Sequence, residues 1–99
     1  MIVVLGTVRL PPEKLDAARP HMQAMVDGSR AEAGCLQYAY AQDVFEPGLI
    51  HVSERWRDRA ALKLHFQTPH MMAWRAAWPD LGVMGRDLAT IETDTLEPL

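Results

Sequence analysis

One stretch of the chain decides the fold, and it runs from His51 to Trp78: HVSERWRDRAALKLHFQTPHMMAWRAAW. The residues from Leu49 to Arg57 include the β-branched and aromatic side chains that are typical of a strand. Asp58 is a good N-cap for a short helix over Arg59 to Gln67. Thr68 is a second N-cap, and the proline after it stands at the first helical position, where a missing N–H costs nothing. The stretch therefore predicts a strand followed by two short helices.

Before this stretch, the sequence predicts a strand, a helix and another strand. Ile2 to Leu10 is apolar and β-branched, and two prolines end it. A helical pattern begins at Glu13 and contains Pro20, which we expect to kink or divide the helix. The helix runs out by Gly34, which fits a C′ glycine. Cys35 to Gln42 then alternates between apolar and polar residues, as a strand does.

The remaining segments complete a regular order of elements. Glu46-Pro47-Gly48 predicts a turn that joins two antiparallel strands. We expect Pro79 to end the last helix, Gly82 to Gly85 to form a loop, and Arg86 to Leu96 to form a fourth strand. The order β-α-β-β-α-β predicts one ferredoxin-like α+β domain over residues 1–99, a four-stranded antiparallel sheet with helices on one face. A bare apolar sheet face predicts a homodimer.

Composition and charge exclude several classes of partner. The net charge is -3 and the pI is about 5.7, and no basic run exists, so we expect neither a nucleic-acid nor a membrane partner. The start of the chain lacks a charged region and a cleavage site, so we expect a strand there and not a signal peptide. The single Cys35 cannot form an intrachain disulfide, which fits a cytoplasmic protein.

Three short motifs resemble those of a known family. They are Gly34–Tyr38 (GCLQY), Glu54–Trp56 (ERW) and Ala61–Met71 (ALKLHFQTPHM). In this order they resemble the antibiotic biosynthesis monooxygenase family, and HFQTPHM is similar to the branch with the quinol monooxygenases. The resemblance implies a dimeric α+β barrel with a pocket between sheet and helices in each subunit. It also implies oxidation of a quinol or another electron-rich aromatic by dioxygen, without bound flavin, haem or metal.

The resemblance also places residues in the pocket. Trp56 matches the tryptophan that lines the pocket in the polyketide-type enzymes. Val52 and Leu62 stand where those enzymes have an asparagine and a tyrosine, which counts against polyketide-type chemistry. Trp74 stands where the haem-degrading relatives have a haem-ligating histidine, which counts against haem.

Two histidines and one carboxylate are the candidates for chemistry. His65 is the candidate general base, because a pKa near 6.5 suits the removal of a phenolic proton. Its alternative is a histidine packed beside Phe66. His70 lies in the first turn of a helix, where the helix dipole favours a neutral imidazole, but a solvent-exposed or capping role is the alternative. Glu54 shares a strand face with Trp56 and is expected to orient His65 or to accept structural hydrogen bonds.

Aromatic residues supply the other candidates for the pocket. Tyr38 and Tyr40 share a strand face with Leu36 and either contribute a hydroxyl group or simply pack. Trp74 and Trp78 lie four residues apart on one helix face, a spacing that is typical of core or interface residues.

We expect no metal site. The five-residue spacing of the two candidate histidines differs from HExxH, which places two ligands on one helix face. With one cysteine in the chain, zinc needs histidine and carboxylates from separate elements.

The sequence thus favours a cofactor-independent monooxygenase that acts on a small aromatic substrate with dioxygen. Two alternatives stay open. The same scaffold with the Thr68–His70 element occurs in a signal-sugar isomerase branch, so a non-oxidative isomerase is one. A non-catalytic protein that binds a small ligand is the other, because a fold does not determine a function.

Overall fold

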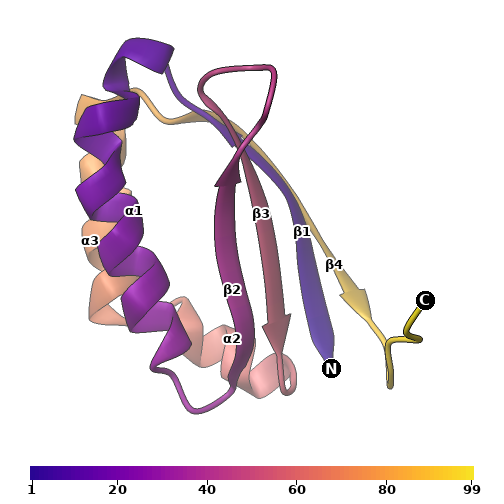
Figure 1. The fold of residues 1–99 in the computed structure, drawn as a ribbon. Coiled ribbons are helices and arrows are strands. Elements are labelled where there is room, and N and C mark those ends of the chain that lie inside the picture. The colour runs from indigo at the N-terminus through magenta and orange to yellow at the C-terminus, as the bar shows by residue number, and fades with distance from the viewer.

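Four strands form a single antiparallel sheet in the computed structural model, which describes residues 1–99 (Figure 1). The strand order is β2-β3-β1-β4. Along the chain the elements are β1 (Ile2–Arg9), a 3₁₀ turn (Pro12–Lys14), α1 (Leu15–Arg30), β2 (Cys35–Gln42), β3 (Leu49–Trp56), α2 (Arg59–His65), α3 (Pro69–Leu81) and β4 (Met84–Glu92). The predicted β-α-β-β-α-β order and ferredoxin-like fold are confirmed.

The helices cover one face of the sheet, and α1 lies beside α3 (Figure 1). Side chains alternate between the two faces of a strand, so one set from each strand meets the helices. The buried set from the two central strands consists of Ile2, Val4, Val8, Ile50, Val52, Glu54 and Trp56. The core therefore lies between this sheet face and the helices, and it includes one carboxylate.

Both predicted helix N-caps are confirmed, and they determine how α2 meets α3. Asp58 accepts a hydrogen bond from the backbone N–H of Ala61 at 2.8 Å. Thr68 Oγ1 accepts from the N–H of Met71 at 3.3 Å and donates to the carbonyl of His65 at 2.8 Å. Thr68 thus ties the end of α2 to the start of α3, so α2 ends at His65 and not at the expected Gln67.

The structure corrects two expectations for α1. Pro20 does not divide the helix, which continues through it as one element, because Pro20 is exposed and water can satisfy the carbonyl that loses its partner. The helix ends at Arg30, and Gly34 is not its C′ residue. A Cβ at Gly34 would lie 2.3 Å from the Cβ of Ala61, so this glycine permits close packing against α2.

The end of α3 also differs from the expectation. Pro79 lies inside the last turn, and the helix ends at Leu81, where Gly82 with a φ of 69° is the C-cap. The N–H groups of Gly82 and Val83 bond the carbonyls of Pro79 and Trp78, which satisfies the end of the helix. As a result β4 starts at Met84, within the predicted loop.

A bulge separates Leu36 from the tyrosines. The pairing of β2 with β3 shifts register between Cys35 and Gln37. Leu36 is 58% exposed, whereas Tyr38 is buried. The expectation that Leu36 shares their face is therefore wrong.

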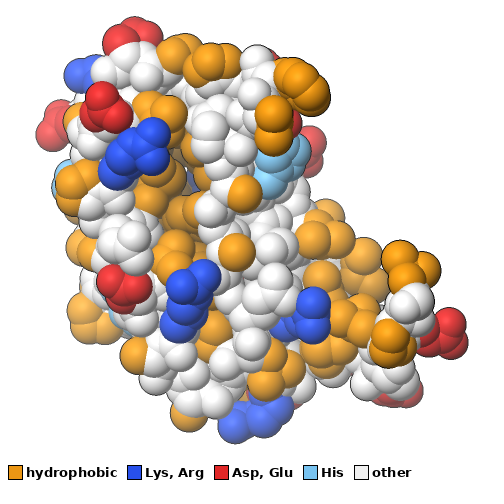
Figure 2. All heavy atoms as spheres, viewed as in Figure 1, with side chains coloured by type: hydrophobic (Ala, Val, Ile, Leu, Met, Phe, Trp, Pro, Cys, Tyr) orange, Lys and Arg blue, Asp and Glu red, His pale blue; other side chains and the backbone are white.

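The edge strand β4 is the least covered part of the sheet. Almost all of its residues are exposed, and its end projects away from the helices together with the C-terminal residues (Figures 1 and 2).

None of the helices has the length and apolar character needed to cross a membrane.

Candidate active site

A cavity of about 190 Å³ lies between the sheet and the helices α2 and α3. Most of its wall is hydrophobic, as in a typical small-molecule pocket with few polar groups. Six of the eight residues predicted for the site line it: Tyr38, Val52, Glu54, Leu62, His65 and Trp74. Residues from the sheet and from α2 and α3 thus surround one enclosed, mainly apolar cavity.

His65 is the imidazole of this cavity, and it is 1% exposed. Its ring packs against those of Trp56 and Tyr38, with centroids 4.5 and 5.5 Å away. Nδ1 lies 2.7 Å from Oε2 of Glu32, and Nε2 has no hydrogen-bond partner in the protein. Burial lowers the pKa of His65, and the bond to Glu32 opposes this effect. When Nδ1 donates to the carboxylate, Nε2 keeps a lone pair that can accept a proton.

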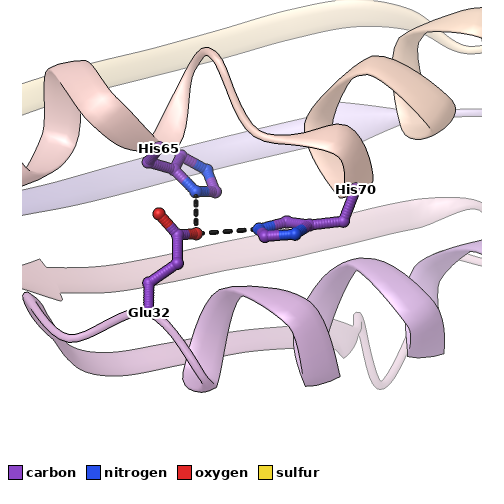
Figure 3. Close-up of side chains that lie close together, drawn as sticks. All are labelled: Glu32, His65 and His70. Atoms are coloured by element: carbon purple, nitrogen blue, oxygen red, sulfur yellow. Dashed lines mark hydrogen bonds and ion pairs between the residues drawn. The ribbon is translucent and has the colours of Figure 1, made fainter.

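Glu32 is a residue of the candidate site that the sequence analysis did not identify. It follows the end of α1, and its Oε2 also lies 2.8 Å from Nε2 of His70 (Figure 3). Of the two roles expected for Glu54, the orienting of His65 is taken by Glu32, and Glu54 instead accepts a structural hydrogen bond from Trp56. The five-residue spacing of His65 and His70 does not predict a ligand from another segment of the chain. In the fold, the Glu32 carboxylate lies between the two histidines.

Two glycines explain how Glu32 comes so close to both histidines. A Cβ at Gly28 would lie 2.6 Å from Cγ of His70, and a Cβ at Gly34 would overlap Ala61. These residues flank Glu32 at the end of α1 and in the following turn. Their missing side chains allow this turn to pack directly on α2 and α3.

Glu54 is a buried carboxylate that accepts a hydrogen bond from one side chain. It is 5% exposed, and its Oε1 accepts from Nε1 of Trp56 at 2.8 Å. Burial raises the pKa of Glu54 to about 7, although the Trp56 bond acts in the opposite direction. Near neutral pH the group is therefore present both as an acid and as a carboxylate.

The tyrosine pair forms another polar part of the wall. The hydroxyl oxygens of Tyr38 and Tyr40 lie 2.9 Å apart. Burial raises the pKa of Tyr38 far above its usual range and that of Tyr40 to about 12. Both are neutral near pH 7, so they can donate a hydrogen bond but do not act as bases.

Two predicted pocket residues do not line the cavity. Trp56 is fully buried and packs against the ring of His65, so it supports this ring without reaching the cavity. His70 is not exposed as the alternative reading expected, but half-buried and bonded to Glu32 outside the cavity wall. Trp74 lines the cavity. The ring of Trp78 packs edge-on against the ring of Trp74, and the guanidinium group of Arg86 lies over the Trp78 ring.

A second hollow of about 350 Å³ lies between α1 and β2 (Figure 2). It is more open than the first, and its polar wall includes Arg19 and Arg30. No histidine or carboxylate lines it. The smaller cavity beside His65 is therefore the better candidate for chemistry.

Comparison with known proteins identifies the family of the chain. The profile of the antibiotic biosynthesis monooxygenase family matches residues 1–77. YcnE of Bacillus subtilis, provisionally named a monooxygenase, is 32% identical over 97 residues, which is 98% of this chain and all of YcnE. A Synechocystis protein of uncharacterised function is 38% identical over 80 residues, which is 81% of this chain but only 54% of that relative.

A solved structure shows the same fold. It is a crystal structure from Deinococcus radiodurans, provisionally assigned as an antibiotic biosynthesis monooxygenase. It superposes with a TM-score of 0.91, covers 100% of this chain and 98% of its own, and is 23% identical in sequence. At this identity the likeness establishes the fold alone.

Proposed function

The chain belongs to the antibiotic biosynthesis monooxygenase family, and we propose that it is a cofactor-independent monooxygenase that oxidises a small electron-rich phenol or quinol with dioxygen. One observation carries the proposal. His65, bonded through Nδ1 to Glu32, lines an apolar cavity and has its second nitrogen unbonded. A carboxylate that holds an imidazole in one tautomer is the usual support of a histidine base.

In the proposed reaction, Nε2 of His65 removes the phenolic proton of the substrate. The resulting phenolate is electron-rich enough to pass an electron to dioxygen. The phenoxyl and superoxide radicals combine at a ring carbon that carries hydrogen (the para carbon of a phenol, a free ortho carbon of a quinol) as a peroxide, which takes the proton back from His65 and becomes a hydroperoxide. The O–O bond then breaks: the ring carbon loses its hydrogen as a proton, the outer oxygen leaves as hydroxide, the two form water, and a carbonyl group remains on the ring carbon. A phenol and O₂ thus give a quinone and H₂O, a four-electron oxidation in which dioxygen is fully reduced. The protein needs only to bind the substrate, deprotonate it and exclude bulk water from the cavity.

The cavity favours a substrate with one ring. A cavity of about 150 Å³ can hold benzene in another protein, and about 190 Å³ leaves little room beyond one substituted ring. Trp74 and Tyr38 supply aromatic walls for such a ring. Glu54 in its acid form can donate a hydrogen bond to a second ring oxygen, as a quinol would present.

We also propose that the protein acts as a homodimer. The sheet face opposite the helices carries the exposed side chains of Leu5 and Ile91, which are 47% and 54% exposed. Exposed apolar residues of this kind are buried at the interfaces of obligate oligomers.

The cytoplasmic location expected from the single cysteine stays a prediction.

A non-oxidative isomerase is the second candidate, and Glu54 is the observation that favours it. His65 and Glu54 line the same cavity; burial raises the pKa of Glu54 to about 7, and Nε2 of His65 makes no hydrogen bond to the protein and can accept a proton. Two such groups suffice to move a proton between neighbouring carbons of one substrate.

The test is oxygen consumption by chelator-treated protein with a panel of hydroquinones, catechols, monocyclic phenols and anthrones. We expect uptake of one O₂ per quinone formed from a phenol, with one ¹⁸O atom in the product when ¹⁸O₂ is supplied. Anthrones should react more slowly because three rings exceed the cavity. Substrate rearrangement without oxygen uptake would favour the isomerase, and binding without any turnover would contradict both enzymes.

A further inference from the structure

We propose that Glu32, His65 and His70 form a binding site for a divalent transition-metal ion, Zn²⁺ above all, and that the bound ion prevents His65 from acting as a base. One ligand atom from each residue lies within 4.8 Å of the other two. Figure 3 shows both imidazole rings turned toward the same carboxylate oxygen. The three residues come from the turn after α1, the end of α2 and the first turn of α3.

The donor set matches Zn²⁺ in chemistry and nearly in distance. Two imidazole nitrogens and one carboxylate oxygen are a common ligand set of open zinc sites, with water in the fourth position. Bonds of 2.0–2.2 Å in a tetrahedron place neighbouring ligand atoms about 3.3 Å apart. Oε2 of Glu32 lies 2.7 and 2.8 Å from the two nitrogens, so these two separations have to grow by about half an ångström. The two nitrogens lie within 4.8 Å of each other and have to approach by at most about 1.5 Å.

The backbone around these three residues is already held in place. The N–H of Glu32 donates to the carbonyl of Ser29 at 3.0 Å, and its own carbonyl accepts from Cys35 at 3.0 Å. Thr68 binds the carbonyl of His65 and begins the helix that carries His70. Such a site needs little reordering on binding, in contrast to a cluster of long surface side chains.

An ion can reach this site from solvent without entering the cavity. The side chains of Glu32 and His70 are 15% and 20% exposed, whereas His65 is buried. Neither Glu32 nor His70 lines the cavity. The ion would therefore lie outside the cavity, away from substrate and oxygen.

Binding at Nδ1 changes what His65 can do at its other nitrogen. An imidazole that binds a metal through one nitrogen while neutral carries its proton on the other. Nε2 then becomes a donor and cannot take the phenolic proton. This inhibitory consequence rests on the proposed function, whereas the binding itself does not.

The binding experiment uses the chelator-treated 99-residue chain, with Zn²⁺ titrated by calorimetry and Co²⁺ by visible absorption. We expect one ion per chain and a tetrahedral Co²⁺ spectrum. Glu32→Gln and His70→Gln, which keep the side-chain size, should weaken Zn²⁺ binding by at least about tenfold. The matched control is His51→Gln, since His51 and Asp43 form an exposed histidine–carboxylate pair at 2.7 Å without a third ligand.

Gly28→Ala provides a variant with all three ligands intact. Its new methyl group has to displace His70, so Zn²⁺ affinity should fall while circular dichroism stays that of a folded protein. Equal Zn²⁺ affinity in the wild type, Glu32→Gln and His70→Gln would overturn the site, as would the absence of any binding by the wild type.

The activity arm separates this proposal from the proposed function. If a substrate turns over, Zn²⁺ should inhibit with a half-point that matches the measured Kd. Activation by Zn²⁺ or Fe²⁺ at the same stoichiometry would overturn the inhibitory role and the cofactor independence together. If no substrate turns over, the binding titration still decides whether the metal site exists.

Discussion

Oε2 of Glu32 lies 2.7 Å from Nδ1 of His65, although 33 residues separate the two in the sequence. The contact joins the turn after α1 to the last residue of α2. It selects the tautomer of a buried imidazole whose other nitrogen makes no hydrogen bond to the protein. The tautomer of the imidazole in the cavity therefore depends on a residue that does not line the cavity.

Loss of the Glu32 carboxylate should reduce catalysis more than substrate binding. In Glu32→Ala the imidazole of His65 loses its hydrogen-bond partner, and we expect kcat to fall by about 10²-fold with little change in KM. Glu32→Gln keeps an acceptor oxygen and should recover part of the rate. Steady-state oxygen uptake measures both, with the exposed Glu13→Gln as control. A parallel rise in KM with unchanged kcat would contradict a role through His65.

The packing of Gly34 on Ala61 predicts a defined loss of stability. In Gly34→Ala the new Cβ would lie 2.3 Å from the Cβ of Ala61, so α2 has to move. We expect the free energy of unfolding to fall by about 1–3 kcal/mol. The double variant with Ala61→Gly removes the opposing methyl group and should recover most of this loss. Urea denaturation measures both, and additive effects of the two substitutions would refute the steric explanation.

Glu54 should make the protein less stable as the pH rises. Its pKa is raised from 4.5 in the unfolded chain to about 7 in the folded protein, so the folded state binds the proton more tightly. This stabilising contribution is complete below pH 4.5 and is lost as the pH rises through about 7, which corresponds to about 3 kcal/mol at most.

Glu54→Gln isolates this contribution, because the amide oxygen can still accept from Trp56. The difference in unfolding free energy between the variant and the wild type should grow in favour of the variant between about pH 5 and pH 8. Burial lowers the pKa of His65, so this residue contributes with the opposite sign, but it is present in both proteins and its contribution cancels in the difference. A difference that stays constant with pH would show that Glu54 titrates normally.

The homodimer is testable by sedimentation. Four strands with helices on one face leave Leu5 and Ile91 exposed, and an obligate interface that covers them should bury more than roughly 2,000 Å² in total. We expect a dimer at micromolar concentration, and Leu5→Glu together with Ile91→Glu should shift it toward monomer. A folded wild-type monomer at this concentration would contradict the expectation.

Local signals in the sequence predicted most of the fold. The caps at Asp58 and Thr68 act over three residues, and strand alternation acts over two, so both can be recognised without the tertiary structure. Pro79 and Gly34 were misread because each also has a local meaning, as a helix stop or a C-cap. In the fold, Gly82 ends α3, and Gly34 makes room for Ala61.

The site was predictable only in part for the same reason. His65 and Glu54 were found because a family motif and a strand face identify them. Glu32 follows a helix in a turn without a recognisable motif, and its partners are 33 and 38 residues away. Contacts of this range depend on how α1 packs against α2 and α3, which no short pattern describes.

The role of His65 itself is decided by two substitutions of different chemistry. A general base contributes about 10²–10⁴-fold to the rate, so His65→Ala should lower kcat by this order. His65→Gln can hold a hydrogen bond to Glu32 but cannot take a proton, so it should lose the same activity. Exposed His21 provides the matched control, and His21→Gln should keep the wild-type rate.

Stability has to be followed in parallel, because His65 is buried among Trp56 and Tyr38. His65→Ala leaves a cavity and should also lower the unfolding free energy, whereas His65→Gln fills most of the space. A base is therefore indicated when both variants lose turnover but only the alanine variant loses much stability. Full turnover in a folded His65→Gln protein would instead make this histidine a structural link between α2 and Glu32, and the proton would have to be taken by Glu54.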